Sequence, residues 1–247
     1  MIPKKIHYCW FGGNPLPDSV KKCIDSWKRF CPNYEIIEWN ESNYDVHKIP
    51  YISEAYKNKK YAFVSDYARL DIIYNEGGFY LDTDVELIKS LDNLSSEHCF
   101  MGMEEPGRVA TGLGFGAEKG HPFVKMNMIE YEDKLFNTKV LETCVDVTTN
   151  LLLSQGLMQE NLYQKINDIS IYPSEFFCPF SMKTQKMEIT KKTYSIHHYD
   201  STWYGNGVSG KIKRKLLPFK IKCRLFVDKY LGDGTYDRVK KIISHYK

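Results

Sequence analysis

Two aspartates, Asp82 and Asp84, lie two residues apart in the middle of an apolar run, NEGGFYLDTDVELIKSL, at residues 75–91. On a regular strand both side chains would point to the same face of the sheet. Two carboxylates on one face repel each other, and burying either one without a positive partner costs free energy. The pattern therefore predicts that the strand opens to solvent here, or that a cation lies between the carboxylates.

The elements around these aspartates predict an α/β fold. Strands are expected in 4–13, where a Gly-Gly turn follows, in 34–40 and in 79–88, and helices in 17–32 and 61–75. This alternation predicts a mostly parallel central sheet with crossover helices. Ligands of such sheets bind beyond the carboxyl ends of the strands. We therefore expect Asp82 and Asp84 at that edge, where carboxylate oxygens suit Mg²⁺ or Mn²⁺.

The composition limits the class of protein. The chain has 247 residues, of which 43% are hydrophobic and 14% aromatic, as in a folded globule with one large domain or one domain and an appendage. Seven cysteines without a CxxC pair indicate reduced thiols in a cytosolic protein, with no zinc site or disulfide framework. No apolar run is long enough for a transmembrane helix, and the N-terminus does not resemble a signal peptide.

The charge is unevenly distributed along the chain. Residues 211–247 hold 12 Lys and Arg against 3 Asp and Glu, a balance of +9, which leaves −6 for residues 1–210. We expect a catalytic domain at 1–210 and a helical, basic amphipathic C-terminal segment at 211–247 that contacts an anionic membrane surface. The alternative is a basic helix packed on its own domain. Nucleic acid is not expected as a partner, because no binding motif accompanies the charge.

The stretch SDYARLDIIYNEGGFYLDTDVELIKSLDNL resembles the signature of the DXD-containing sugar transferases. That family includes the yeast initiating α-1,6-mannosyltransferase, bacterial capsule and lipopolysaccharide transferases, and the glucosylating domains of the large clostridial toxins. The resemblance covers 4–13 and about 60–95, and more loosely 197–204. It implies a GT-A fold, a nucleotide-sugar donor, a divalent metal (Mn²⁺ or Mg²⁺) and retention of the anomeric configuration.

The resemblance implies roles for residues near the first strand. Trp10 matches the aromatic residue that stacks on the nucleotide base, a contact commonly worth about 1–3 kcal/mol; the alternative is a core aromatic residue. Gly12 and Gly13 would let the backbone approach the nucleotide, although they would equally suit an ordinary turn.

Asp66 and Arg69 lie three residues apart in the expected helix 61–75, so they share one helix face. In an apolar surrounding such a pair is either a structural salt bridge or a rigid clamp for a sugar. The resemblance implies the clamp, which holds hydroxyls and phosphate of the donor. Tyr80, which points the same way as Asp82 on a regular strand, is expected to line the same pocket.

The segment SIHHYDSTWYGNG at 195–207 predicts a short strand that runs into a Gly-rich loop. By resemblance to the toxin-like members, His198, Ser201 and Trp203 take the positions of an acidic metal ligand, a serine and a tryptophan that close the metal site. Histidine replaces the acid, and it is a normal Mn²⁺ ligand. Since His197 and His198 face opposite sides of a strand, only one should bind the metal, and we favour His198. Trp203 would donate its indole N–H to the diphosphate. The alternative is an aromatic loop packed on the core.

Beyond the aspartates, the Gly-rich segment 104–123 lacks the pattern of a phosphate-binding loop, and a helix is expected at 122–136. This segment lies where an acceptor site would form, with Glu104 and Glu105 as its acidic candidates.

The resulting hypothesis is a bacterial-type, metal-dependent retaining glycosyltransferase at the cytoplasmic face of the cell membrane. It would move a hexose or N-acetylhexosamine from a nucleotide-sugar, with a UDP-sugar favoured, to a lipid-linked capsule or lipopolysaccharide intermediate. The alternatives are a catalytically silent relative that binds nucleotide-sugars and a metal-dependent phosphotransferase or nuclease. A silent relative would be expected to have lost some of the candidate site residues, all of which are present here: Trp10, Asp66, Arg69, Asp82, Asp84 and a C-terminal histidine. A phosphotransferase or nuclease would be expected to show further acidic ligands or a phosphate-binding loop.

Overall fold

A seven-stranded sheet is the centre of the structure, a computed structural model that describes residues 1–138, 141–181, 184 and 186–199. β1 pairs in parallel with β2 and β3, and β5 pairs in parallel with β8, whereas β6 and β7 run against the other strands. The predicted α/β class with a mostly parallel sheet is therefore confirmed. In spatial order the strands are β2 (Glu35–Trp39), β1 (Lys5–Cys9), β3 (Gly78–Tyr80), β6 (Arg108–Ala117), β5 (Cys99–Glu105), β8 (Ile169–Tyr172) and β7 (Gln164–Ile166).

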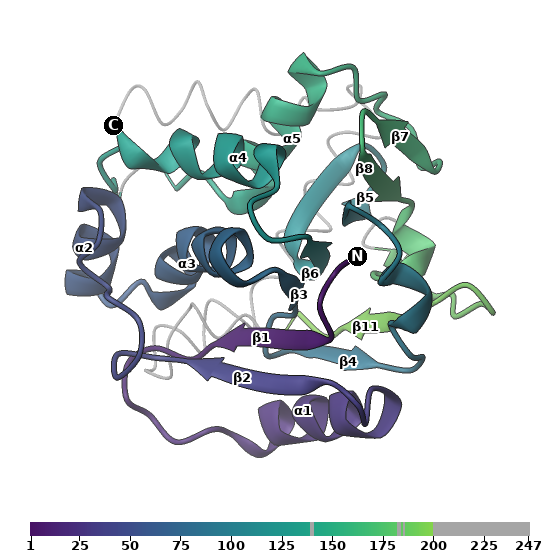
Figure 1. Cartoon of the computed structure of the whole chain (residues 1–247), viewed down its shortest axis with the longest axis horizontal. Helices are drawn as coiled ribbons and strands as arrows, with labels where there is room; N and C mark the ends of the chain where they lie inside the picture. Colours follow the sequence, from purple (N-terminus) through teal and green to yellow (C-terminus); the bar gives the residue numbers. More distant parts are fainter. Residues whose placement is uncertain (139–140, 182–183, 185, 200–247) are drawn as a thin grey trace. The chain divides into compact units, whose positions relative to one another are not determined.

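Helices cover both faces of this sheet (Figure 1). α1 lies against one face, and α3 and α4 lie against the other, each face having its own cluster of buried apolar side chains. Neighbouring residues of β3 show the division, because Phe79 belongs to the cluster under α1 and Tyr80 to the cluster under α3. The helices are α1 (Asp18–Phe30), α2 (Pro50–Lys57), α3 (Tyr61–Glu76), α4 (Pro122–Glu132) and α5 (Cys144–Ser154).

The helix predicted at 17–32 is α1, and the helix predicted at 61–75 is α3, which ends as expected at a glycine. Gly77 has a φ of 65°, which a residue with a Cβ adopts only at a cost, and its N–H donates to the carbonyl of Ile73. The helix predicted at 122–136 is shorter than expected and ends at Glu132.

The amino end of β3 is held by His7. Its Nε2 is 2.9 Å from the carbonyl oxygen of Gly77, and its Nδ1 accepts a hydrogen bond of 3.1 Å from Trp39 Nε1. The imidazole is completely buried, and burial lowers the pKa of His7 to about 4. A neutral ring with a proton on Nε2 satisfies both contacts, so His7 fixes the point at which α3 passes into β3.

The strand predicted at 79–88 is wrong as a single element. β3 ends at Tyr80, the N–H of Asp82 donates to the carbonyl of Gly112, and the N–H of Val85 donates to the carbonyl of Asp82. The first bond still joins the chain to β6, the neighbouring strand, whereas the second spans three residues and closes a turn that takes the chain out of the large sheet.

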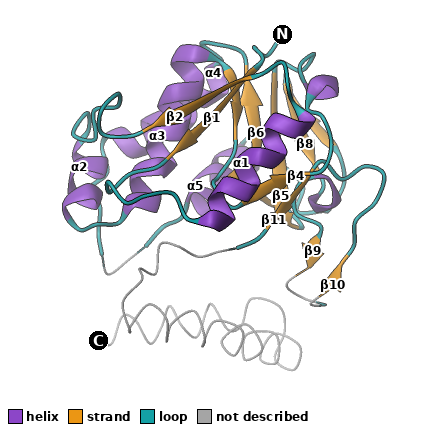
Figure 2. Ribbon diagram, turned by 90° about the horizontal axis from the view of Figure 1, so that it is seen from below, coloured by secondary structure: helices purple, strands orange, loops and turns teal. Residues whose placement is uncertain are grey.

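After the turn, β4 (Val85–Leu87) pairs with β11 (Ser195–His197) in a separate two-stranded sheet. Helix α1 lies beside β4 (Figure 2) and supports it through two hydrogen bonds. Trp27 Nε1 donates to the carbonyl of Val85 at 2.7 Å, and Ser26 Oγ accepts from Leu87 N–H at 2.9 Å. The aspartates therefore lie where the chain passes from one sheet to the other.

The remaining elements are short. They are two 3₁₀ turns, η1 (Asp92–Leu94) and η2 (Ser174–Phe176), and the paired strands β9 (Phe180–Ser181) and β10 (Lys186–Met187). Within the part of the chain described, no helix is both long and apolar enough to cross a bilayer. Ser201, Trp203, the boundary at residue 210 and the basic segment 211–247 lie outside the described residues.

Candidate active site

Arg69 is the centre of the candidate site. Its guanidinium reaches Asp66 Oδ1 through Nη1 at 3.0 Å and Asp82 Oδ1 through Nη2 at 2.9 Å, with 4% of the side chain exposed. The Tyr80 ring lies 5.0 Å from the guanidinium carbon, in cation–π contact. The structure thus brings together four residues that the sequence predicted, and Arg69 joins the helix to the DXD turn. Tyr80 is almost fully buried and packs against Arg69, and its predicted place in the donor pocket stays a prediction.

Cys144, a residue that the sequence did not suggest, completes the surroundings of Arg69. Arg69 Nη1 donates to its Sγ at 3.1 Å, and Cys144 is the first residue of α5, behind a capping box formed by Thr143 and Asp146. Thr111 Oγ1 and Arg69 Nε are buried and have no hydrogen-bond partner among the described residues. Buried polar atoms without partners are rare in folded proteins, and two of the six in the described residues lie at this clamp.

The environment of Asp66 makes its negative charge costly. Burial raises the pKa of Asp66 to about 6, even though the Arg69 guanidinium acts in the opposite direction. Only 10% of the side chain is exposed. Asp66 is therefore a carboxyl whose surroundings destabilise its ionised form, and its role in binding donor hydroxyls stays a prediction.

Gly112 on β6 sets the position of Asp82. A Cβ on Gly112 would collide with Asp82 Oδ2, and the backbone at Gly112 does not have a positive φ. The carbonyl of Gly112 also accepts from the N–H of Asp82 at 2.8 Å. Glycine is needed here for the close approach of the carboxylate, and not for an unusual backbone conformation.

The structure places His197, and not His198, against the second aspartate. His197 Nε2 is 3.3 Å from Asp84 Oδ1, whereas His198 Nε2 is 2.8 Å from Glu86 Oε2 at the surface. The two histidines do face opposite sides, as predicted, but the antiparallel register of β11 on β4 points His197 inward. Which histidine binds a metal stays a prediction, and this geometry favours His197 over His198.

Asp84 and His197 fit a divalent cation. Two ligands bound to adjacent corners of an octahedral ion with bonds of about 2.1 Å are roughly 3 Å apart, close to the spacing of this pair. Among the residues that the structure describes, no group of three or more His, Cys, Asp and Glu side chains is arranged as a complete metal site. Mg²⁺-type ions commonly use one or two protein ligands and take the rest from water and substrate phosphates, so a two-residue pair is sufficient.

The pair is charged when no metal is bound. Burial lowers the pKa of His197, but the carboxylate of Asp84 and the neighbouring Cys178 together raise it well above its ordinary value. A cation bound here would replace the proton on the imidazole, so its binding would release a proton at neutral pH.

The predicted nucleotide side lies at the carboxyl end of β1. Trp10 is half-buried, and its Nε1 donates to the carbonyl of Asn14 at 2.6 Å, so part of its ring remains open to solvent. Gly12 has a φ of 98°, and its N–H donates to Glu41 Oε1, while the Tyr61 ring covers the position that a Cβ would take. The stacking role of Trp10 stays a prediction, as does the approach of the nucleotide to Gly12 and to Gly13, which has open space around it.

The predicted acceptor side is a β-hairpin, not an irregular glycine loop. Glu104 and Glu105 end β5, and Arg108 begins β6. Burial raises the pKa of Glu104, against the opposing effect of Arg108 and of His197, which is close enough for its charge to act on the carboxyl. Glu104 thus lies near the Asp84–His197 pair, but its role toward an acceptor stays a prediction.

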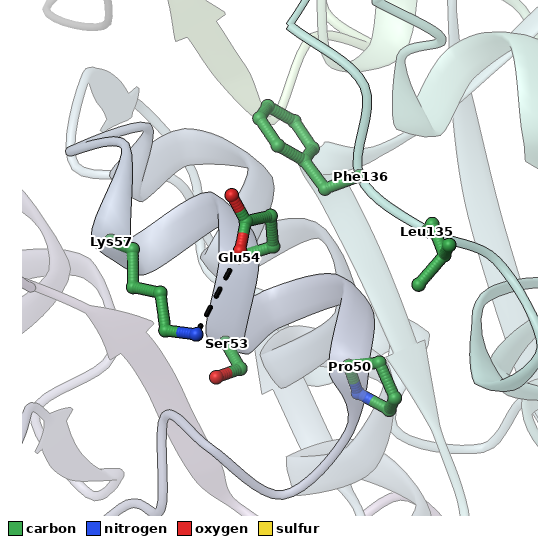
Figure 3. Close-up of a pocket in the computed structure, with 6 residues that line it drawn as sticks. All are labelled: Pro50, Ser53, Glu54, Lys57, Leu135 and Phe136. Carbon is green, nitrogen blue, oxygen red and sulfur yellow. Dashed lines mark ion pairs between the residues drawn. The ribbon is translucent and has the colours of Figure 1, made fainter.

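A separate hollow of about 500 Å³ lies between α2 and the residues after α4 (Figure 3). It includes none of the predicted site residues, and its polar groups Glu54 and Lys57 form an ion pair of 3.8 Å with each other. Its lining consists of Pro50, Ser53, Glu54, Lys57, Leu135 and Phe136.

Some of the residues that sequence reasoning missed left a signal. Glycines alternate along β6 at 112, 114 and 116, and a Cβ at each would meet a bulky group, which is the pattern of close approach on one strand face. Cys144 and the pairing of His197 with Asp84 left no signal of this kind, because they depend on contacts between distant segments.

Comparison with known proteins identifies the family of the segment that carries this site. Residues 17–101 match the family described as "Glycosyltransferase sugar-binding region containing DXD motif". The resemblance inferred from the sequence is therefore confirmed for this segment, which contains Asp66, Arg69, Asp82 and Asp84.

The relatives are themselves glycosyltransferases, in agreement with the predicted enzyme class. The inositol phosphoceramide mannosyltransferase 3 of Schizosaccharomyces pombe is 30% identical over 131 residues, which are 50% of this chain and 35% of that protein. The chain therefore spans about a third of the length of this relative. The uncharacterized glycosyltransferase L373 of Acanthamoeba polyphaga mimivirus is 25% identical over 202 residues, 75% of this chain and 76% of that protein. Among solved structures, the PaToxG glycosyltransferase has a TM-score of 0.49 and 20% identity over 63% of this chain and 70% of its own.

Proposed function

We propose that this chain is a metal-dependent, retaining glycosyltransferase that moves a hexose or N-acetylhexosamine from a nucleotide-sugar to a lipid-linked saccharide acceptor. The observation that carries the proposal is the Arg69 junction: one buried guanidinium joins Asp66 to Asp82, beside the Asp84–His197 pair, inside the segment that matches the family.

Each group has a task in this reaction. Arg69 and Asp66 bind donor hydroxyls and phosphate and hold the sugar in one orientation, which lowers the entropic part of the barrier. Trp10 offers a ring face to the base. Asp84 and His197 would hold the cation, which supplies charge neutralisation for the departing diphosphate. UDP is the favoured nucleotide, Mn²⁺ or Mg²⁺ the favoured cation, and retention follows from the family resemblance.

The site disfavours the alternatives. A metal-dependent nuclease or phosphotransferase would need both aspartates free for metal ions, whereas Asp82 is already bound by Arg69 and packed on Gly112. A catalytically silent relative would not need a buried carboxyl that the fold destabilises, as Asp66 is.

The test is a panel of UDP- and GDP-sugars with Mn²⁺, in which release of free sugar and nucleotide is measured with and without EDTA. We expect hydrolysis of one UDP-sugar and its loss in EDTA. Nucleoside triphosphates and DNA serve as matched substrates for the alternatives. Turnover that is unchanged in EDTA, or turnover of triphosphates or DNA alone, would contradict the proposal.

For the acceptor, we propose a lipid-linked intermediate of capsule or lipopolysaccharide at the cytoplasmic membrane face. The support is the balance of +9 over residues 211–247 and the lipid named in the mannosyltransferase relative. Full-length protein should cosediment with anionic vesicles at low salt and not with neutral ones. Charge reversal of Lys213, Arg214 and Lys215 should weaken this binding, and equal binding by the reversed variant would contradict the membrane proposal.

A further inference from the structure

Tyr199 makes a close ring contact with the candidate metal ligand. The ring centroids of His197 and Tyr199 are 4.1 Å apart with an interplanar angle of 35°. β11 ends at His197, so the contact is not the ordinary spacing of two residues along a strand. A ring at this distance fills the space into which the imidazole would otherwise turn.

The backbone at Tyr199 is unusual. Its φ is 53°, in the left-handed region that disfavours residues with a Cβ, and only two other residues of the described chain other than glycine share a positive φ. Strained conformations of this kind persist where the surrounding structure determines them, and they are concentrated at functional sites.

Cys178 holds the far end of the Tyr199 side chain. Its Sγ is 3.0 Å from the Tyr199 hydroxyl, and the thiol is buried, with the residue 2% exposed. The backbone around it is fixed as well: the N–H of Cys178 donates to the carbonyl of Ser174 at 2.8 Å, and Ser195 Oγ of β11 donates to the carbonyl of Phe177 at 3.1 Å. Tyr199 is therefore held at its ring by His197 and at its hydroxyl by a rigid segment.

We propose that Tyr199, anchored by Cys178, is the positioning residue that fixes the His197 imidazole beside Asp84 for metal binding. The proposal rests on the function proposed above. Metal-bound histidines depend on neighbours that fix the orientation of the ring, and removing such a neighbour typically costs about 10- to 100-fold in metal affinity. Here the neighbour acts through a close, tilted ring contact, and the thiol keeps that ring in place.

The experiment measures Mn²⁺ binding to the full chain by the electron paramagnetic resonance signal of free Mn²⁺, alone and with UDP. Tyr199→Ala should raise the Mn²⁺ dissociation constant by about 10- to 100-fold. It keeps a Cβ, so it does not remove the backbone strain. Tyr199→Phe, which removes only the hydroxyl that contacts the Cys178 thiol, should raise the constant by about 2- to 10-fold, the value of one hydrogen bond.

A double-mutant cycle separates positioning from a general structural effect. In the His197→Ala background, Tyr199→Ala should cause no further loss of Mn²⁺ affinity, because it acts only through the imidazole. An additive loss, or wild-type affinity in Tyr199→Ala, would overturn the proposal while leaving the proposed function intact. Absence of Mn²⁺ binding by the wild type would overturn the proposed function itself. If Tyr199→Ala does not fold, Tyr199→Leu takes its place in the same cycle.

Discussion

Two histidines lie near the two ends of β3, His7 buried at the amino end and His197 partly buried beyond the carboxyl end, and their protonation differs. At the amino end, His7 has a partner on each ring nitrogen, is neutral, and its pKa is lowered to about 4 by burial. Beyond the carboxyl end, His197 faces Asp84, and its pKa is raised well above the ordinary value, even though burial alone would lower it. A histidine is therefore neutral and structural at the amino end of β3, and another carries a charge beyond its carboxyl end.

The two ends of β3 also differ in how far their buried polar groups are satisfied by hydrogen bonds. The amino end, with Gly77 and His7, satisfies its polar groups internally. The carboxyl end leaves Arg69 Nε, Thr111 Oγ1 and His197 Nδ1 buried without a hydrogen-bond partner among the described residues. Unused hydrogen-bonding capacity lies where a ligand is expected, at a cost in stability that the opposite end does not have.

The largest effect should come from Asp84→Asn. Loss of the charge should reduce transfer by about 10³-fold or more, because the cation that neutralises the leaving diphosphate is no longer held. The amide keeps the shape of the side chain, so the melting temperature should stay close to that of the wild type. Turnover of the donor with Mn²⁺ and thermal unfolding measure the two quantities.

Glu86→Gln is the matched control, because it changes the neighbouring carboxylate–histidine pair, Glu86–His198, at the surface. It should leave activity within about twofold of the wild type, since an exposed pair contributes little. If Glu86→Gln were the inactive variant and Asp84→Asn the active one, the assignment of His197 over His198 would be reversed.

The second effect concerns Gly112→Ala. The added Cβ pushes Asp82 away from its contact with Arg69, and a displacement of about 1 Å in a catalytic group can cost roughly 10²-fold in rate. Gly116→Ala, four residues further on the same strand, meets the Phe100 ring instead and should cost about 1–3 kcal/mol of stability without a change in activity per folded molecule. Equal activity in the two folded variants would show that Gly112 does not position Asp82.

The third effect is the dependence of folding stability on pH that His7 causes at the amino end of β3. The folded pKa of His7, about 4, lies below the unfolded value, so the unfolded state binds the proton first as the pH falls from 6.5 to 4. The native state should lose about 3 kcal/mol over this range through His7. Urea unfolding of the wild type and of His7→Gln at each pH gives two free energies of unfolding. The change with pH in the difference between them is the contribution of His7. A difference that is constant with pH would refute it.

The fourth effect has the opposite sign and belongs to the carboxyl end. The folded pKa of Asp66, about 6, lies above the unfolded value, so the native state binds the proton first, and stability falls as the pH rises from 3.8 to 6. Relative to Asp66→Asn, the wild type should lose roughly 1–3 kcal/mol over this range when unfolding is followed in EDTA. Parallel pH profiles of the two proteins would show that Asp66 does not carry this cost.

The fold could be predicted from local patterns, and the site only in part. Gly77, Pro32 and the helical spacing of apolar residues marked α1 and α3, and the apolar run before Asp82 marked β3. The end of β3 was missed because the turn that closes between Val85 N–H and the carbonyl of Asp82 contains no glycine or proline to mark it. Asp66 and Arg69 were found because helix spacing alone makes them neighbours.

The choice between His197 and His198 could not be made from spacing. It depends on the register of β11 on β4, two strands more than 100 residues apart, and a shift of one residue would exchange the two side chains. Cys144 and Tyr199 were missed for the same reason, since neither belongs to a pattern within its own segment. Contacts that link distant elements are set by the assembled fold.

The pairing of β11 with β4 has a consequence for dissecting the protein. The segment that matches the family ends at Met101, inside β5. The partners of Asp84 come from β11 and the residue after it: the N–H of His198 donates to the Asp84 carbonyl at 3.0 Å, and His197 pairs with its carboxylate. A fragment cut before Ser195 would retain both aspartates and the arginine but would leave β4 with an open edge. Such a fragment should need the missing strand supplied in trans, as a peptide, before its second aspartate regains its histidine.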